Sequence, residues 1–212
     1  MHNEDLRIRK IIHILRKRYG YKYKKSNPYR SLITTILSQR TKDETTDEAA
    51  KRLFHVVKTP KEMVKLSEKK IAKLIYPVGF YEQKAKNIKT TSRILLEKYN
   101  GKVPNDRNLL MELHGVGGKT ADVVLCFAFG LDTIPVDTHV CVISQRLGFT
   151  KNKDPEKIKN DLEKIIPSDL KKVVNYLFVE FGKKICQARL PKCYICPIEK
   201  LCSYEKKNLK IV

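Results

Sequence analysis

Apolar residues recur at helical spacing along nearly the whole chain, and this pattern restricts the fold more than any other feature. Residues 4–19, 26–39 and 80–101 show it clearly, and residues 119–129 show it again. Further helical patterns follow Asp43, Thr59, Ser67, Asp106, Asp137, Asp154 and Ser168. No segment alternates apolar and polar residues as a convincing strand does. The sequence therefore predicts an all-α protein.

Capping residues place the ends of several of these helices. Asn3 is a candidate cap for the first helix, and Gly20 is its stop signal. Ser26 or Asn27 precedes Pro28, and "TPKE" (59–62) reads as a capping box. We expect the helix of residues 80–101 to end at Asn100-Gly101.

The charge of the chain indicates a polyanionic partner. Lys and Arg total 44 against 23 Asp and Glu, which gives a formal charge of +21. The longest apolar run, "VVLCFAFGL" (123–131), is too short to cross a bilayer, and the first residues lack the features of a signal peptide. Trp is absent and aromatic residues are 8%, which disfavours a dedicated single-strand binder. We expect a cytoplasmic protein that binds duplex nucleic acid rather than a membrane.

Three glycines crowd around one lysine in "LHGVGGKTADVV" (113–124). The pattern predicts a helix, a turn at Gly115, Val116, Gly117 and Gly118, and a second helix whose free amides can seat a phosphate. A tight turn without any ligand is the alternative for the glycines. Lys119 follows them directly, where its free amine can be a nucleophile; the alternative is an ordinary solvated lysine.

Asp137 lies in "IPVDTHVCVISQRLG" (134–148), just before a helical pattern. It is a candidate N-cap, and the same carboxylate can assist proton abstraction at a sugar carbon if its helix packs near Lys119. His139 is expected to be a structural histidine.

Four cysteines near the C-terminus have the spacing C-x6-C-x2-C-x5-C: Cys186, Cys193, Cys196 and Cys202. Four thiolates can hold zinc or an iron–sulfur cluster, and the presence of only one close pair favours iron–sulfur over zinc. Disulfides are a minor alternative in a cytosolic protein.

Two basic residues and two further cysteines complete the set of candidates. Arg189 and Lys192 lie between the first two cysteines of the motif, on a loop that can dock on phosphates. Cys126 and Cys141 lie in apolar helical contexts and are interpreted as core residues.

Together these motifs resemble those of the endonuclease III family of DNA glycosylases. "LHGVGGKTA", "VDTH" and the four-cysteine spacing occur in the order typical of that family, and "ILSQRTKDE", "VGFYEQKAKNI" and "GKVPND" look like family segments too. The resemblance implies a six-helix barrel with a helix-hairpin-helix over residues 22–131. It also implies a second helical domain of residues 1–21 plus 132–212 with a [4Fe–4S] cluster, and a substrate cleft between the two domains.

The resemblance also implies an activity and its residues. Lys119 and Asp137 match the catalytic pair of the family, and Cys186, Cys193, Cys196 and Cys202 match its cluster ligands. The expected enzyme is a bifunctional DNA glycosylase and abasic-site lyase of base excision repair. It removes oxidised pyrimidines and cuts 3′ to the abasic site through a lysine Schiff base. We expect a monomer that binds duplex DNA with damaged bases or abasic sites, associated with the nucleoid of a prokaryotic cell.

Three positions depart from the family pattern. His114 stands where proline is usual, and Gly118 replaces a commonly larger residue. The family inserts a glutamine into the base stack from an "LSAQATD"-like segment, whereas "LSQRTKD" offers either Gln39 or Arg40 for this role.

Four other functional classes are alternatives for this chain. Two of them, adenine-specific and thymine-mismatch glycosylases, resemble the same scaffold but typically lack a lysine at the position of Lys119. A non-catalytic helix-hairpin-helix module would not need Lys119 and Asp137 together, and an electron-transfer protein would not need so much positive charge.

Overall fold

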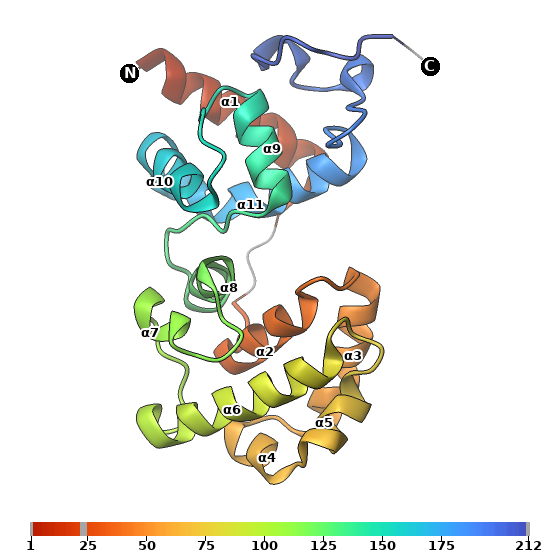
Figure 1. Cartoon of the computed structure of the whole chain (residues 1–212). Helices are drawn as coiled ribbons and strands as arrows, with labels where there is room; N and C mark the ends of the chain where they lie inside the picture. The colour runs from red at the N-terminus through yellow and green to blue at the C-terminus, as the bar shows by residue number, and fades with distance from the viewer. Residues whose placement is uncertain (1, 22–24, 211–212) are drawn as a thin grey trace. The chain divides into compact units, whose positions relative to one another are not determined.

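The chain is helical throughout the residues that its computed structural model describes, which are 2–21 and 25–210 (Figure 1). No strand occurs among these residues, so the prediction of an all-α fold is confirmed. The chain forms two compact units, one from residues 24–130 and one from residues 1–23 with 131–212. The assignment of residues 22–131 to a barrel domain and of the remainder to a cluster domain stays a prediction.

The unit of residues 24–130 is one continuous stretch of chain. Its helices are α2 (Pro28–Ser38), α3 (Asp43–Val56), α4 (Pro60–Lys65), α5 (Glu68–Ile75), α6 (Tyr81–Tyr99), α7 (Arg107–Met111) and α8 (Gly118–Val124), followed by a π-helical turn, η1 (Leu125–Phe129). They surround one apolar core, to which α2 contributes Leu32, Ile33, Ile36 and Leu37. The long helix α6 packs on α4 and α5 at one side of this unit (Figure 1).

The other unit combines the start of the chain with its last third. Its helices are α1 (His2–Tyr19), α9 (Thr138–Arg146), α10 (Pro155–Ile165) and α11 (Ser168–Lys184), with two short 3-10 turns, η2 (Cys193–Ile195) and η3 (Glu199–Leu201). Helix α11 packs against both α1 and α9, and the core includes Ile8, Leu15, Leu177 and Phe178.

Most helix ends lie where the capping residues predict them. Asn27 accepts from the amide of Arg30 at 3.0 Å, and Thr59 forms a complete capping box with Glu62. Asn100 takes a left-handed conformation at the end of α6. Gly20 does the same after α1, with φ of 65°.

Two details differ from the sequence-based expectation. Asn3 is not an N-cap, because α1 begins at His2 and Asn3 lies inside its first turn. The helical pattern of residues 119–129 also does not run as one α-helix, since α8 ends at Val124 and the chain continues as the π-helical turn η1. Among the described helices, none combines the length and the apolar character that a membrane span requires.

Candidate functional site

The predicted helix-hairpin-helix consists of α7, a turn of residues 112–117, and α8. Arg107 of α7 and the buried Asp122 of α8 form an ion pair, with Nε 3.0 Å from Oδ1, so the two helices are linked by charge. Leu113 and Val116 are buried in the core and anchor the turn from within. The hairpin is therefore a rigid element of its unit.

Gly115 and Gly117 of the turn differ in whether the structure explains the presence of glycine. Gly115 has φ of 79°, a left-handed conformation that favours glycine, and a Cβ on it would lie 2.9 Å from Asn87 Nδ2. A Cβ on Gly117 would meet nothing within 4 Å, and the residue is exposed. The space beside Gly117 is therefore open to an external group.

Side chains bind two carbonyl groups of the turn, whereas no side chain caps the amides at the start of α8. Thr91 Oγ1 donates to the carbonyl of His114 at 3.0 Å, and Gln39 Nε2 donates to that of Gly115 at 2.8 Å. The N-cap of α8 is Gly117, which has no side chain to accept from the first-turn amides. The phosphate site predicted at these amides stays a prediction, and the Lys119 side chain is exposed beside them.

The two candidates for the stack-inserting residue occupy different environments. Gln39 is bound to the hairpin, since its Nε2 also lies 3.2 Å from Thr120 Oγ1. Arg40 is exposed in a left-handed conformation, with φ of 51°, and its guanidinium carbon lies 5.6 Å from the ring centre of Phe80. Phe80 is also left-handed and is 64% exposed. Arg40 and Phe80 thus form an exposed cation–aromatic pair on two tightly constrained turns.

Lys84 of α6 holds the turn of residues 39–41 through hydrogen bonds. The sequence did not indicate this role. Its buried Nζ donates to the carbonyl of Leu37 at 2.8 Å, to that of Gln39, and to Thr41 Oγ1 at 3.1 Å. Burial lowers the pKa of Lys84 to about 8. Only the fold reveals this role, because the partners lie more than forty residues away in sequence.

Asp137 is the N-cap of α9, as predicted, and its Oδ1 accepts from the amide of Val140 at 2.9 Å. The segment leading to it is held from two helices. Glu163 of α10 accepts from Thr133 Oγ1 at 2.8 Å, and Asn175 Nδ2 of α11 donates to the carbonyl of Pro135 at 2.8 Å. Asp137 is therefore well fixed within its own unit, which is a different unit from that of Lys119.

His139 is structural, as expected, but it acts through packing. A Cβ on Gly182 of α11 would lie 2.4 Å from His139 Nδ1, so the imidazole occupies the space that this glycine leaves. The contact fixes the first turn of α9 against α11.

The four predicted ligand cysteines lie together. Cys186, Cys193, Cys196 and Cys202 line one pocket, and none of them is in a disulfide. Burial raises the pKa of Cys196 to about 11 and also raises that of Cys186. Metal binding would therefore displace a proton from each of these two thiols.

The four thiols supply a donor set that suits either metal class. Four cysteine sulfurs can hold a single zinc ion or an iron–sulfur cluster. As placed in the structure, no three ligating side chains among the described residues are close enough to hold one ion. The choice of a cluster over zinc therefore stays a prediction from the cysteine spacing.

The remaining candidates also have defined places. Arg189 is exposed in the loop between Cys186 and Cys193, beside Leu190, which is 73% exposed. Lys192 is half-buried, and its amide closes this loop by donating to the carbonyl of Ile185 at 2.9 Å. Cys126 is buried as predicted, whereas Cys141 is only half-buried.

Comparison with known proteins agrees with these features. Residues 33–168 match the HhH-GPD superfamily of base excision DNA repair proteins. The chain is 43% identical over 194 residues to the endonuclease III of Thermotoga maritima, a match that covers 92% of this chain and 91% of that protein. The chain belongs to the endonuclease III family. Like the family, it is a DNA glycosylase and abasic-site lyase.

Other relatives extend the likeness to the endonuclease III family. The endonuclease III of Escherichia coli K12 is 41% identical over 182 residues, which is 86% of each chain. A trapped covalent intermediate of an endonuclease III with DNA has a TM-score of 0.84 at 36% identity, over 93% of this chain and 95% of that one. A thermostable thymine-DNA glycosylase also has a TM-score of 0.84, at 27% identity, over 95% of each chain.

Proposed function

We propose that this chain removes oxidised pyrimidines from duplex DNA and cuts the strand 3′ to the resulting abasic site through a Schiff base on Lys119. The observation that carries the proposal is the position of Lys119, exposed in the first turn of α8 beside amides that no side chain caps. A phosphate bound at those amides would place a sugar within reach of the amine.

The proposed reaction begins with a nucleotide turned out of the duplex, which costs least for a poorly stacked base. The Lys119 amine attacks C1′, the glycosidic bond breaks, and the base leaves with the bonding electrons. Opening of the sugar ring gives the Schiff base, and loss of a C2′ proton then expels the 3′ phosphate. Asp137 stabilises positive charge on the sugar and assists the proton transfers.

Single-turnover cutting of a duplex with one oxidised pyrimidine tests this function. We expect cutting at the damaged position and a covalent protein–DNA product when borohydride is added. Binding without cutting would instead identify a non-catalytic hairpin module. Release of thymine from a mismatched duplex, with no base released from the oxidised one, would favour the activity of the thymine-DNA glycosylase neighbour.

We propose Arg40, rather than Gln39, as the residue that enters the base stack. The Gln39 amide already bridges to the hairpin, whereas the Arg40 guanidinium is exposed over Phe80. Arginine can both stack on bases and donate two hydrogen bonds to guanine.

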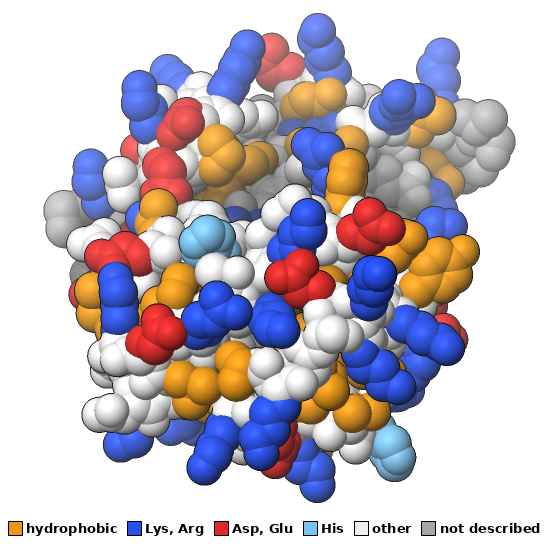
Figure 2. All heavy atoms as spheres, turned by 60° about the horizontal axis from the view of Figure 1, so that its bottom comes forward, with side chains coloured by type: hydrophobic (Ala, Val, Ile, Leu, Met, Phe, Trp, Pro, Cys, Tyr) orange, Lys and Arg blue, Asp and Glu red, His pale blue; other side chains and the backbone are white. Residues whose placement is uncertain are grey.

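Duplex DNA as the partner is supported by the surface charge. Six exposed lysines lie between residues 58 and 73, and none of them forms an ion pair with another described residue: Lys58, Lys61, Lys65, Lys69, Lys70 and Lys73. Figure 2, which brings the bottom of Figure 1 forward, shows Lys and Arg side chains over much of the face that it draws. We propose that the protein works as a monomer on the DNA of the nucleoid.

Binding to DNA should weaken steeply with salt. If about five phosphates are neutralised, log affinity should fall against log salt with a slope of about −4 to −5. Replacing the exposed Arg189 by Glu should weaken binding to damaged and undamaged duplexes alike, because phosphate contacts do not depend on sequence. Fluorescence anisotropy over a salt series measures both effects, and a flat salt dependence would contradict the polyanion interpretation.

We propose that Cys186, Cys193, Cys196 and Cys202 hold a [4Fe–4S] cluster. The position of all four cysteines on one pocket, each with a free thiol, supports it. The cluster, when bound, would have a structural role, because it would fix the loop that carries Arg189 and Lys192.

Metal analysis of protein purified without air tests the cluster. We expect iron and acid-labile sulfide in equal amounts, because the cluster contains four of each. Replacing Cys196 by Ser should lower iron content and soluble yield more than it changes the chemistry at Lys119. Stoichiometric zinc without sulfide would refute the assignment.

A further inference from the structure

Two arginines from distant parts of the sequence hold the two ends of the cysteine segment. Arg146, the last residue of α9, is 8% exposed and binds the first end. Its Nη1 lies 2.8 Å from the carbonyl of Gln187 and 3.2 Å from both the carbonyl and the Sγ of Cys186. Its Nη2 donates to the carbonyl of Ala188 at 2.8 Å. One guanidinium thus fixes three successive residues at the first cysteine.

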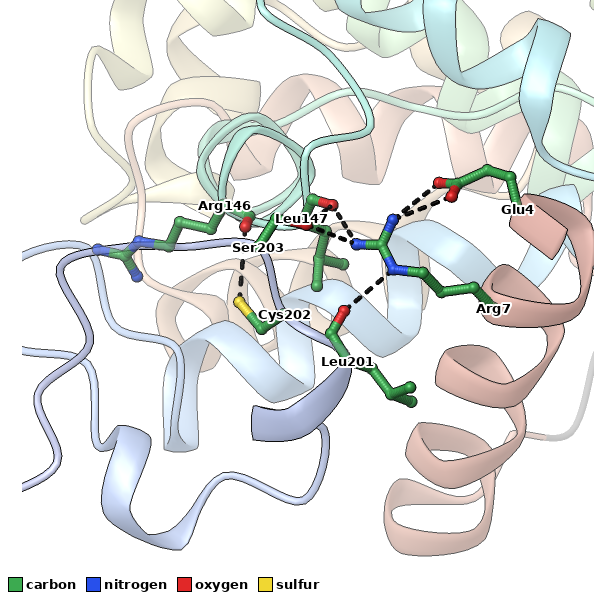
Figure 3. Close-up of polar contacts among 7 residues, drawn as sticks. All are labelled: Glu4, Arg7, Arg146, Leu147, Leu201, Cys202 and Ser203. Carbon is green, nitrogen blue, oxygen red and sulfur yellow. Dashed lines mark hydrogen bonds and ion pairs between the residues drawn. The ribbon is translucent and has the colours of Figure 1, made fainter.

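Arg7 of α1 binds the other end of the segment (Figure 3). Its Nε donates to the carbonyl of Leu201 at 3.1 Å, and its Nη2 donates to Ser203 Oγ at 3.1 Å and to the carbonyl of Leu147. Glu4 holds the guanidinium in place, 2.9 Å from Nη1. The two residues that flank Cys202 are therefore tied to α1.

Both arginines are connected to the C-terminal end of α9, where Arg146 is the last residue and Leu147 follows it. Leu147, which follows Arg146 in the chain, accepts from Arg7 and also from Ser203 Oγ at 3.3 Å (Figure 3). Between its two ends the cysteine segment has only the short turns η2 and η3. A loop with so little regular structure needs side chains from elsewhere to keep four thiols in one pocket.

We infer that Arg146 and Arg7 are positioning residues for the proposed cluster, and that the N–H of Arg146 donates to the sulfur of Cys186 in the loaded protein. This inference rests on the cluster proposed above. A hydrogen bond to a ligand sulfur stabilises the more negative, reduced form of a cluster, so Arg146 should also raise its reduction potential.

The chain offers a matched control in Arg9, which lies on the same helix as Arg7. Arg9 forms ion pairs with Asp5 at 3.2 Å and Asp169 at 3.0 Å, so its guanidinium binds these carboxylates rather than the cysteine segment. Replacing Arg9 by Met removes an arginine with ion pairs from α1 without touching the loop. It therefore separates loop positioning from general loss of stability.

The experiment compares iron release from the loaded wild-type protein with that from Arg146→Met, Arg146→Lys, Arg7→Met and Arg9→Met. Release to an iron chelator is followed by the visible absorbance of the cluster. We expect release to be about 10- to 100-fold faster for Arg146→Met, the usual range for the loss of an outer-shell partner, and several-fold faster for Arg7→Met. Arg146→Lys should recover part of the loss, and Arg9→Met should release iron as the wild type does.

The reduction potential gives a second readout that a merely structural role would not move. We expect it to become more negative in Arg146→Met and to stay unchanged in Arg7→Met, because only Arg146 donates to a ligand sulfur. Should Arg146→Met fail to fold, the comparison of Arg7→Met with Arg9→Met still decides the positioning role.

Three results separate failure of the inference from failure of the proposal beneath it. Wild-type protein without iron would overturn the cluster itself. Iron-loaded variants that release iron at the wild-type rate would overturn the positioning role alone. Equal lability of Arg7→Met and Arg9→Met would show that α1 acts only through general stability, which also overturns it.

Discussion

Replacing Lys119 by Gln should lower strand cutting by at least about 10³-fold and abolish the borohydride crosslink, while duplex binding stays within a few-fold of the wild type. Glutamine keeps a long polar side chain but cannot form a Schiff base. The backbone amides of the hairpin, which are proposed to bind phosphate, are unchanged by the substitution. Single-turnover cutting, borohydride trapping and fluorescence anisotropy measure the three effects.

Lys98 supplies the matched control for this experiment, because it is an exposed lysine on α6 in the same unit. Replacing Lys98 by Gln should leave both cutting and trapping unchanged. If Lys119→Gln retained wild-type cutting and crosslinking, the nucleophile would be another residue and the assignment of the catalytic lysine would fail.

Replacing Asp137 by Asn should slow turnover by about 10²- to 10⁴-fold, which is the usual contribution of a positioned acid or base. The change removes the charge but keeps the cap, since asparagine accepts from the amide of Val140 as aspartate does. The variant should therefore fold normally and still give some trapped product, because the Lys119 amine is intact. Rates from single-turnover cutting, together with thermal unfolding, check this expectation.

Asp106 allows capping to be separated from chemistry. It is the N-cap of α7 and accepts from the amide of Leu109 at 3.0 Å, in the same geometry as Asp137 on α9. Asp106→Asn should leave turnover unchanged. Equal turnover in Asp137→Asn and the wild type would reduce Asp137 to a structural cap.

Local sequence signals predicted the helices and their caps because the groups involved are neighbours in the chain. Asn27, Thr59, Asp106 and Asp137 all accept from amides three residues ahead, so spacing alone identifies them. Asn3 is not a cap, because α1 begins two residues before the start that this signal indicates, and α3 and α11 begin at Asp43 and Ser168 themselves rather than after them. The cysteine spacing likewise predicted a set of residues that the fold brings to one pocket.

The supporting residues could not be predicted, because their partners are far away in sequence. Arg7 and Leu201 are 194 positions apart, and Lys84 and Leu37 are 47 apart. Neither arginine nor lysine stands out in a chain with 44 basic residues. The role of Gly182 could not be predicted either, because it depends on the side chain of His139, which the fold packs against this glycine.

The discontinuity of one unit has a consequence for how the protein matures during synthesis. Residues 24–130 are contiguous and can collapse as soon as they have left the ribosome. Helix α1 is made first, yet it packs against α11. Its apolar face therefore cannot be fully buried until α11 has been made, up to residue 184. The cysteine segment follows later still. In the proposed enzyme, a newly made chain therefore contains its hairpin before it contains all four of the cysteines that would hold its cofactor.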